Sequence, residues 1–187
     1  MINIPPYNDR SDITVLPFEG ISPRIHSSVF IASGARIIGD VEIGEQSSIW
    51  YNVVIRGDVH WIKIGVRTNI QDLVMCHVTN KKHPLTICND VTIGHSAVLH
   101  GSTINDKVLV GMGAILLDKS VIGTNSIVAA GTVVKEGFVV PEGVLIAGVP
   151  GKIIRDLNDD EKLYSAKGAA NYKGYVERFI KSGFELY

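Results

Sequence analysis

The chain has 187 residues, of which 45% are hydrophobic and 20% are charged, and this length suits one well-buried domain rather than two. The formal net charge of -1 at pH 7 provides no basic field for nucleic acid or anionic lipid, so we expect neither partner and a small molecule instead. No apolar run reaches the ~18 residues that span a bilayer, and Cys76 and Cys88 form no C-x-x-C pair, so we expect a cytoplasmic protein without a membrane segment or disulfide scaffold.

The N-terminal segment, residues 1–24, contains Pro5, Pro6 and Pro17 and no repeat, which predicts an arm and cap. From residue 25 to residue 151 an apolar residue recurs at every sixth position, apart from a few gaps of other lengths. Neither a helix nor a hairpin requires this period, which is typical of a solenoid of short, stacked parallel strands. The twenty marker positions are Ile25, Ile31, Ile37, Ile43, Ile49, Ile55, Ile64, Ile70, Cys76, Ile87, Ile93, Leu99, Ile104, Val110, Leu116, Ile122, Val128, Val134, Val140 and Ile146.

Two gaps between markers are longer than six residues, and both contain polar side chains. The gap from Ile55 to Ile64 contains RGDVHW, and the gap from Cys76 to Ile87 contains TNKKHPLT. Insertions in a solenoid form loops that tend to gather around a binding face. We therefore expect the functional site beside these two loops.

Arg56, His77 and His100 each directly follow a marker on the same side of consecutive coils. Because the markers point inward, the residues next to them point outward and form a column. His100 follows His77 by 23 residues, which equals one coil of three hexads plus a five-residue loop, so the two imidazoles should lie one coil apart. Zinc prefers imidazole nitrogens, and three protein ligands with one open position form a catalytic site, so His95 is the expected third ligand.

After Pro150 the period stops, and residues 152–187 predict a C-terminal helix that packs along the solenoid. Asn158 and Glu161 form a capping-box pattern, and acidic residues occupy the first turn. The expected apolar stripe of this helix consists of Leu163, Ala166, Ala170, Tyr172, Val176 and Phe179.

Several motifs carry a family resemblance: N-V-x-x-R-G-D, N-I-Q-D and C-H within residues 49–78, and G-H-x-x-x-x-H within residues 92–101. With the hexads and the closing GVPGK, they resemble the γ-class carbonic anhydrase family of hexapeptide-repeat proteins, over nearly the whole chain from residue 25. The resemblance implies an all-β solenoid, a three-sided left-handed parallel β-helix of about seven coils, followed by a C-terminal α-helix.

The same resemblance implies a site shared between subunits. It assigns His77, His95 and His100 as ligands of zinc, or of iron or cobalt in some members, in a homotrimer where His77 and His100 come from one chain and His95 from its neighbour. It further implies catalytic roles for an ion pair between Arg56 and Asp58, for Gln71 beside the bound water, and for Asp72 behind the histidines.

The implied activity is that of a zinc-dependent carbonate dehydratase, a lyase whose metal-activated water hydrates CO2 to bicarbonate. The family prototype has loop glutamates as proton shuttles, whereas the only acid in the loops here is Asp58, which leaves His60 and His83 as candidates. Two alternatives stay open. One is a CoA-thioester-related acyltransferase or thioesterase, and the other is a non-catalytic metal-binding subunit.

Overall fold

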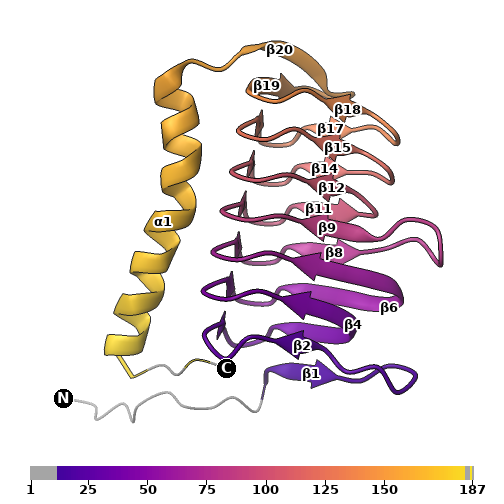
Figure 1. The fold of residues 1–187 in the computed structure, drawn as a ribbon, viewed down its shortest axis with the longest axis vertical. Helices are drawn as coiled ribbons and strands as arrows, with labels where there is room; N and C mark the ends of the chain where they lie inside the picture. The colour runs from indigo at the N-terminus through magenta and orange to yellow at the C-terminus, as the bar shows by residue number, and fades with distance from the viewer. Residues whose placement is uncertain (1–11, 184–185, 187) are drawn as a thin grey trace.

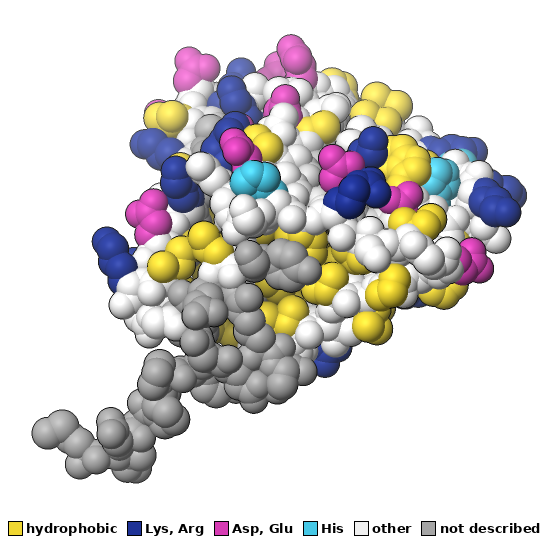
Figure 2. Space-filling model, turned by 60° about the horizontal axis from the view of Figure 1, so that its bottom comes forward, with side chains coloured by type: hydrophobic (Ala, Val, Ile, Leu, Met, Phe, Trp, Pro, Cys, Tyr) yellow, Lys and Arg dark blue, Asp and Glu magenta, His cyan; other side chains and the backbone are white. Residues whose placement is uncertain are grey.

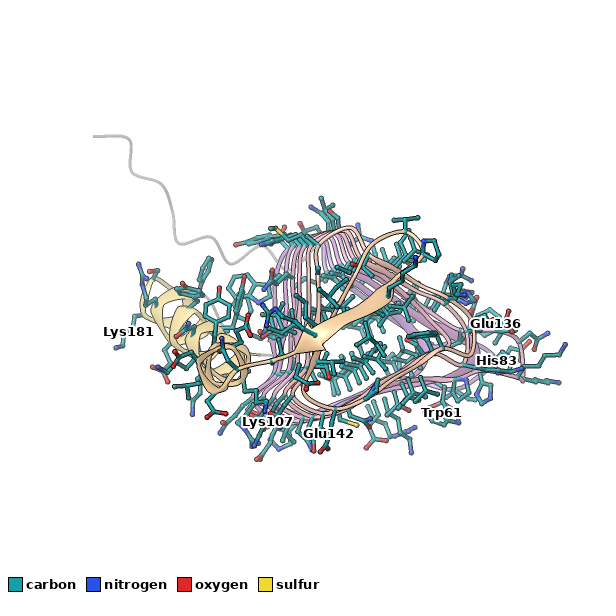
Figure 3. The ribbon with its side chains drawn as sticks, turned by 90° about the horizontal axis from the view of Figure 1, so that it is seen from above. Trp61, His83, Lys107, Glu136, Glu142 and Lys181 are labelled. Carbon is teal, nitrogen blue, oxygen red and sulfur yellow. The ribbon has the colours of Figure 1, made fainter. Side chains whose placement is uncertain are left out.

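A computed structural model describes residues 12–183 and 186. Short parallel strands stack into a solenoid of about seven turns, and a single long helix, α1 (Asp159–Lys181), runs beside the stack (Figure 1). Seen along the stack, the coils superimpose as a three-sided prism with α1 outside it (Figure 3). The left-handed parallel β-helix that the family resemblance implies is therefore confirmed.

The strands divide among three sides of the prism. Side 1 contains β1 (Thr14–Leu16), the first half of β4 (Arg36–Ile43) and of β6 (Val54–Ile64), then β8 (Met75–His77), β11 (Val98–His100), β14 (Ile115–Leu116) and β17 (Val133–Val134). Side 2 contains β2 (Arg24–Ile25), the second halves of β4 and β6, then β9 (Leu85–Ile87), β12 (Thr103–Ile104), β15 (Val121–Ile122) and β18 (Val139–Val140). Side 3 contains β3 (Phe30–Ile31), β5 (Ser48–Ile49), β7 (Asn69–Ile70), β10 (Thr92–Ile93), β13 (Leu109–Val110), β16 (Ile127–Val128), β19 (Val144–Ala147) and β20 (Lys152–Asp156).

The marker residues fill the interior of the prism. Every marker from Ile31 to Ile146 is at most 5% exposed, and Ile25 is half-buried at the first coil. Because side chains alternate along a strand, the residues on either side of a marker face outward. At many corners the third residue after a marker has left-handed φ, and glycine or a polar residue is common there, as at Gly113 (67°) and Asn125 (56°).

The two predicted excursions both lie at the corner between sides 1 and 2. The long strands β4 and β6 continue around this corner, with a register shift between Gly39 and Val41, and they join sides 1 and 2 into one sheet. The second excursion is closed by an antiparallel bridge between Thr79 and His83. Trp61 and His83 lie at this corner, on the far side of the prism from α1 (Figure 3). The loops therefore gather at one edge, as the gap lengths predict.

Helix α1 begins with the predicted capping box. Oδ1 of Asn158 accepts a hydrogen bond from the Glu161 backbone at 2.9 Å, and the Glu161 carboxylate accepts one from the Asn158 backbone at 3.0 Å. The helix then packs on the outer face of side 3, where aromatic rings of the two elements meet. For example, the ring centroids of Trp50 and Tyr172 are 5.4 Å apart, and those of Trp50 and Phe179 are 5.3 Å apart.

The predicted apolar stripe of α1 is correct in its C-terminal half and wrong in its N-terminal half. Leu163 is 52% exposed and Ala170 is exposed, whereas Ala169 is 4% exposed. The aromatic contacts of Tyr172 fix the rotation of the helix, and Ala169, three residues earlier, shares that face. The side chain of Ala166 lies outside the described residues.

Between the solenoid and α1, β20 pairs with β19 in the antiparallel direction. The sequence pattern contained no signal for this strand. The division of the chain at residues 24 and 151 stays a prediction, although β1 precedes residue 25, β2 begins at Arg24, and both strands already pair with β4.

The surface matches the balanced composition. Lys and Arg side chains lie among Asp and Glu over the face shown in Figure 2, with no large area of one sign. In the described part of the chain, no helix is long and apolar enough to cross a membrane.

Candidate metal centre

His77 and His100 occupy paired positions on adjacent strands of side 1. The strands β8 and β11 are parallel, and their register places His100 opposite His77, next to the pair formed by Leu99 and Cys76. Nδ1 of His77 lies 3.1 Å from Nε2 of His100, and the two ring centroids are 5.2 Å apart. The adjacency that the spacing of 23 residues predicts is therefore present.

Each of these imidazoles has a carboxylate behind it. Nε2 of His77 lies 3.1 Å from Oδ1 of Asp58, and Nδ1 of His100 lies 2.7 Å from Oδ1 of Asp118. A carboxylate only accepts hydrogen bonds, so these outer nitrogens carry the protons. In the neutral imidazoles, the two inner nitrogens then face each other with their lone pairs.

This arrangement suits a cation between the two rings. Two nitrogens bound at about 2.0–2.1 Å to a tetrahedral zinc ion are roughly 3.3–3.4 Å apart. The observed separation of 3.1 Å between the inner nitrogens of His77 and His100 is close to that value. We call Asp58, His77, His100 and Asp118 the paired-histidine half-site, and its donor set fits a divalent transition metal.

Electrostatics keeps the carboxylates of this half-site ionised. Burial acts to raise the pKa of Asp58, but hydrogen bonds from Arg56 and His77 hold it below its ordinary value. The same holds for the pKa of Asp118, which hydrogen bonds from Thr79 and His100 lower against the effect of burial. The predicted pair of Arg56 and Asp58 is present as a direct contact between Nη1 and Oδ2.

His95 lies elsewhere, at the corner between sides 3 and 1. Its Nδ1 is 2.7 Å from Oδ2 of Asp72, which occupies the same corner one coil earlier. Gln71 precedes Asp72, is 6% exposed, and donates from Nε2 to Oδ1 of Asn69 at 3.2 Å. We call Gln71, Asp72 and His95 the His95 half-site.

The structure thus divides the predicted site residues into two groups. The paired-histidine half-site contains two candidate ligands and the His95 half-site contains one. Among residues 12–183 and 186, no three His, Cys, Asp or Glu side chains are grouped so that they can hold a metal ion together. One chain by itself therefore does not assemble the three predicted ligands.

A cavity of about 480 Å³ adjoins the His95 half-site. It lies between α1 and side 3, and Gln71 and His95 form part of its wall together with Tyr164, Asn171 and Tyr172. None of the described residues that line it has a charged side chain, and much of its floor consists of small or aliphatic residues. Burial raises the pKa of Tyr172 to about 12, with smaller contributions from Asp72 and Tyr175, so its hydroxyl keeps its proton at neutral pH.

The two candidate proton shuttles both lie near the paired-histidine half-site. His60 lines a second cavity, of about 530 Å³, together with Asp58, and its Nδ1 accepts a hydrogen bond from the Trp61 backbone at 2.9 Å. His83 belongs to the second excursion, residues 79–86, which we call the Thr79 loop. It lies close enough to Asp118 to help lower the pKa of that carboxyl.

Asp118 is the site residue that sequence reasoning missed. It follows Gly101, the neighbour of His100, by 17 residues, which is the length of this coil because Leu99 pairs with Leu116, and this interval was the signal that could have revealed it. Asp118 lies at the corner, two residues after the marker Leu116. The residues of the outward column, such as His100, instead come directly after a marker. The side chain of Asp118 reaches back along the stack to His100.

Comparisons with known proteins agree with this fold and these motifs. Residues 22–57 match the hexapeptide family described as bacterial transferase hexapeptide (six repeats). The chain is 50% identical over 147 residues to a carbonic anhydrase of Geobacillus kaustophilus, covering 79% of this chain and 80% of that protein. It is 44% identical over 173 residues to protein YrdA of Escherichia coli, covering 89% of this chain and 94% of that protein.

A solved structure from Bacillus cereus, described as a candidate acetyltransferase, superimposes with a TM-score of 0.88 at 38% identity, covering 90% of this chain and 97% of that one. The fold and the hexads define a hexapeptide-repeat protein. Within that class, the chain belongs to the γ carbonic anhydrase-like family.

Proposed function

We propose that the protein is a metal-dependent carbonic anhydrase whose site forms where two copies of the chain meet. The paired-histidine half-site of one chain and the His95 half-site of the next together provide three imidazole ligands, the set typical of catalytic zinc. The observation that carries the proposal is the pair of inner nitrogens of His77 and His100, 3.1 Å apart, with carboxylates on both outer nitrogens. Zinc is the proposed ion, and iron or cobalt suit the same donors.

An apolar column on the outer face of side 1 supports assembly of copies. Paired residues of consecutive strands form it, and all are half-buried in the single chain: Val54, Met75, Val98, Ile115 and Val133. Side 1 lies between the two half-sites, since His95 is at one of its corners and the loops are at the other. A second copy that covers the column would bring its own His95 toward the paired histidines, and cyclic repetition of this contact closes a homotrimer.

The chemistry follows from what each side chain does in such a site. When bound, a divalent ion supplies the Lewis acidity that makes water a nucleophile near neutral pH. Gln71 has its amide nitrogen committed to Asn69, so its carbonyl oxygen is available to accept a hydrogen bond from the attacking water and orient it. Asp72, Asp58 and Asp118 hold the histidines in position as hydrogen-bond acceptors.

Proton release is assigned to His60. Because Arg56 and His77 lower the pKa of Asp58, this carboxylate is a poor proton acceptor at neutral pH. His60 lines the same cavity as Asp58, and an imidazole can both accept and release a proton. The reduced state of Cys76 and Cys88 suits a cytoplasmic location for the reaction.

Mixing two inactive variants tests whether the site is shared. The variant His77→Ala keeps an intact His95, and His95→Ala keeps an intact histidine pair. After co-refolding of equal amounts, about a quarter of the interfaces in a random trimer join one intact half-site to the other. We expect metal content and CO2 hydration near a quarter of wild type from the mixture, against near zero from either variant alone. No recovery in a verified mixed trimer would refute a site between chains.

The cavity beside His95 favours one second candidate, hydrolysis or transfer of an acyl group from a thioester. The volume of about 480 Å³ is larger than CO2 requires, and the uncharged lining suits a short acyl chain. Stopped-flow CO2 hydration and thioester hydrolysis, measured on the same metal-loaded sample, distinguish the two reactions. Substitution of Leu109, on the floor of this cavity, by Trp should impair only a reaction whose substrate occupies it.

A further inference from the structure

We propose that Asp118 is a positioning residue that fixes the tautomer and the orientation of His100 and couples them to the Thr79 loop. This role rests on the proposed metal site, and it adds a residue outside the predicted ligand set. The observation is a chain of hydrogen bonds. Thr79 Oγ1 donates to Oδ2 of Asp118 at 2.6 Å, and Oδ1 of Asp118 accepts from Nδ1 of His100 at 2.7 Å.

The chain of contacts leaves one proton arrangement for His100. A carboxylate has no proton to donate, so Nδ1 of His100 must carry the hydrogen. Nε2 of the neutral ring is then unprotonated and directed at His77. A histidine ligand needs such a nitrogen, and a carboxylate on the opposite nitrogen raises its basicity as a ligand. Asp118 therefore prepares His100 as a ligand before any metal arrives.

A glycine makes this contact possible. Gly101 follows His100 and occupies the corner position where Asp118 sits one coil later. A Cβ on Gly101 would clash with Oδ1 of Asp118 and lie 2.8 Å from Cβ of His83, and the residue has φ of +53°. The corner is thus open on one coil so that the acid of the next coil can reach the histidine.

The same network ties His100 to both loops. Thr79 opens the second excursion, and its backbone donates to the His83 carbonyl at 3.1 Å. Lys81 in that loop donates from its backbone to the Val59 carbonyl of the first excursion at 3.0 Å. The hydroxyl of Thr79 occupies the second oxygen of Asp118, which prevents the carboxylate from rotating away from His100.

Nitrogen-15 NMR of the histidine rings tests this role directly. Long-range proton–nitrogen spectra of the full-length protein, recorded with zinc and again after chelation, report which ring nitrogen carries the proton. The variants are Asp118→Leu, which keeps the volume and removes the acceptor, Asp118→Asn, which keeps one acceptor oxygen, and Thr79→Val. Glu136→Gln is the matched control, because Glu136 lies one coil beyond Asp118 at the same corner and is 64% exposed.

In the chelated wild type, we expect His100 to be protonated at Nδ1. Asp118→Leu should shift His100 toward the Nε2-protonated form and weaken zinc binding by about 10–100-fold. Asp118→Asn should restore the Nδ1 proton with intermediate affinity, Thr79→Val should act in the direction of Asp118→Leu, and Glu136→Gln should change neither quantity. An unchanged tautomer and an unchanged zinc affinity in folded Asp118→Leu would overturn the proposal.

The NMR result separates this inference from the proposed function. The tautomer is measured in the chelated protein and needs neither metal nor CO2. If the wild type binds no metal while His100 still depends on Asp118 for its Nδ1 proton, the proposed function fails and the positioning role holds. If metal binds with wild-type affinity and the tautomer ignores Asp118, the proposed function holds and the positioning role fails.

Discussion

Oδ2 of Asp72 lies 2.7 Å from Nδ1 of His95, so the third candidate ligand, like the other two, has an acid on the nitrogen that faces away from the proposed ion. Loss of this acceptor should leave the ring free to turn. We expect Asp72→Leu to weaken zinc binding by about 10–100-fold, measured by competition with a chelating dye. Asp90→Asn is the control, because Asp90 pairs with Arg67 rather than with a histidine.

His77→Ala should remove bound metal and leave the solenoid intact. The side chain points outward from β8 and contributes nothing to the interior, which consists of the markers and other buried apolar residues. Metal analysis of protein purified without chelator should fall from one ion per chain to near zero, with an unchanged far-ultraviolet circular dichroism spectrum. His26→Ala, at an exposed histidine paired with Ser28, should keep its metal. Full metal occupancy in His77→Ala would contradict the ligand assignment.

Leu99→Ala should strongly destabilise the solenoid. Leu99 is fully buried in the core, and truncation of a buried leucine costs about 2–5 kcal/mol in the free energy of unfolding. Denaturant unfolding at one fixed protein concentration measures the change. Val139→Ala, at a side chain that is 62% exposed on side 2, should stay within about 0.5 kcal/mol of wild type. Equal effects of the two substitutions would show that the marker column is not the core.

Asn158→Ala should loosen the start of α1. The side chain caps the helix by accepting from the Glu161 backbone, and loss of such a cap costs about 0.5–2 kcal/mol. Hydrogen exchange should accelerate in the first turn of α1, at the amides of Glu161 and Lys162, which donate to Asn158, while exchange in β7 and β10 stays slow. Asn158→Asp, which retains an acceptor at the cap, should restore protection.

Acid should weaken the same helix end in a defined window. Hydrogen bonds from Arg155 and from the Asn158 backbone lower the pKa of Glu161 from 4.5 to about 2. A carboxyl whose pKa is lower in the folded state contributes stability that is complete above 4.5 and is lost as the pH falls toward 2. A carboxyl-carbon NMR titration should show this low midpoint, and Arg155→Gln should return it toward 4.5. A midpoint near 4.5 in the wild type would contradict the contact.

The fold was predictable because its signal repeats. Buried apolar residues recur at about every sixth position from Ile31 to Ile146, so many positions indicate the same period. A wrong burial assignment at one of them does not change that period. The adjacency of His77 and His100 followed from the same counting, because coil length converts sequence distance into stacking. Side chains that act within one strand pair are therefore predictable in a solenoid.

Side chains at corners were harder to predict. Asp118 contacts His100 only because Gly101 leaves room, and that depends on the backbone at a turn rather than on the period. The rotation of α1 was wrong over its first turns, since Trp50 and Phe30 on side 3 select the face of the helix that is buried. The strand β20 had no sequence signal, because its partner is an edge that exists only after the coils have stacked.

That edge gives β20 a protective role at the last coil. A parallel stack has no intrinsic end, so the exposed rim of β19 would offer its backbone groups to the first coil of another molecule. β20 runs antiparallel to β19, and a bulge shifts the register at the Ile146–Ile153 pair. It therefore covers the backbone groups at the edge of β19 with a strand onto which another coil of parallel strands cannot stack. Chains cut before Lys152 should therefore associate end to end into fibres, while the intact protein remains discrete.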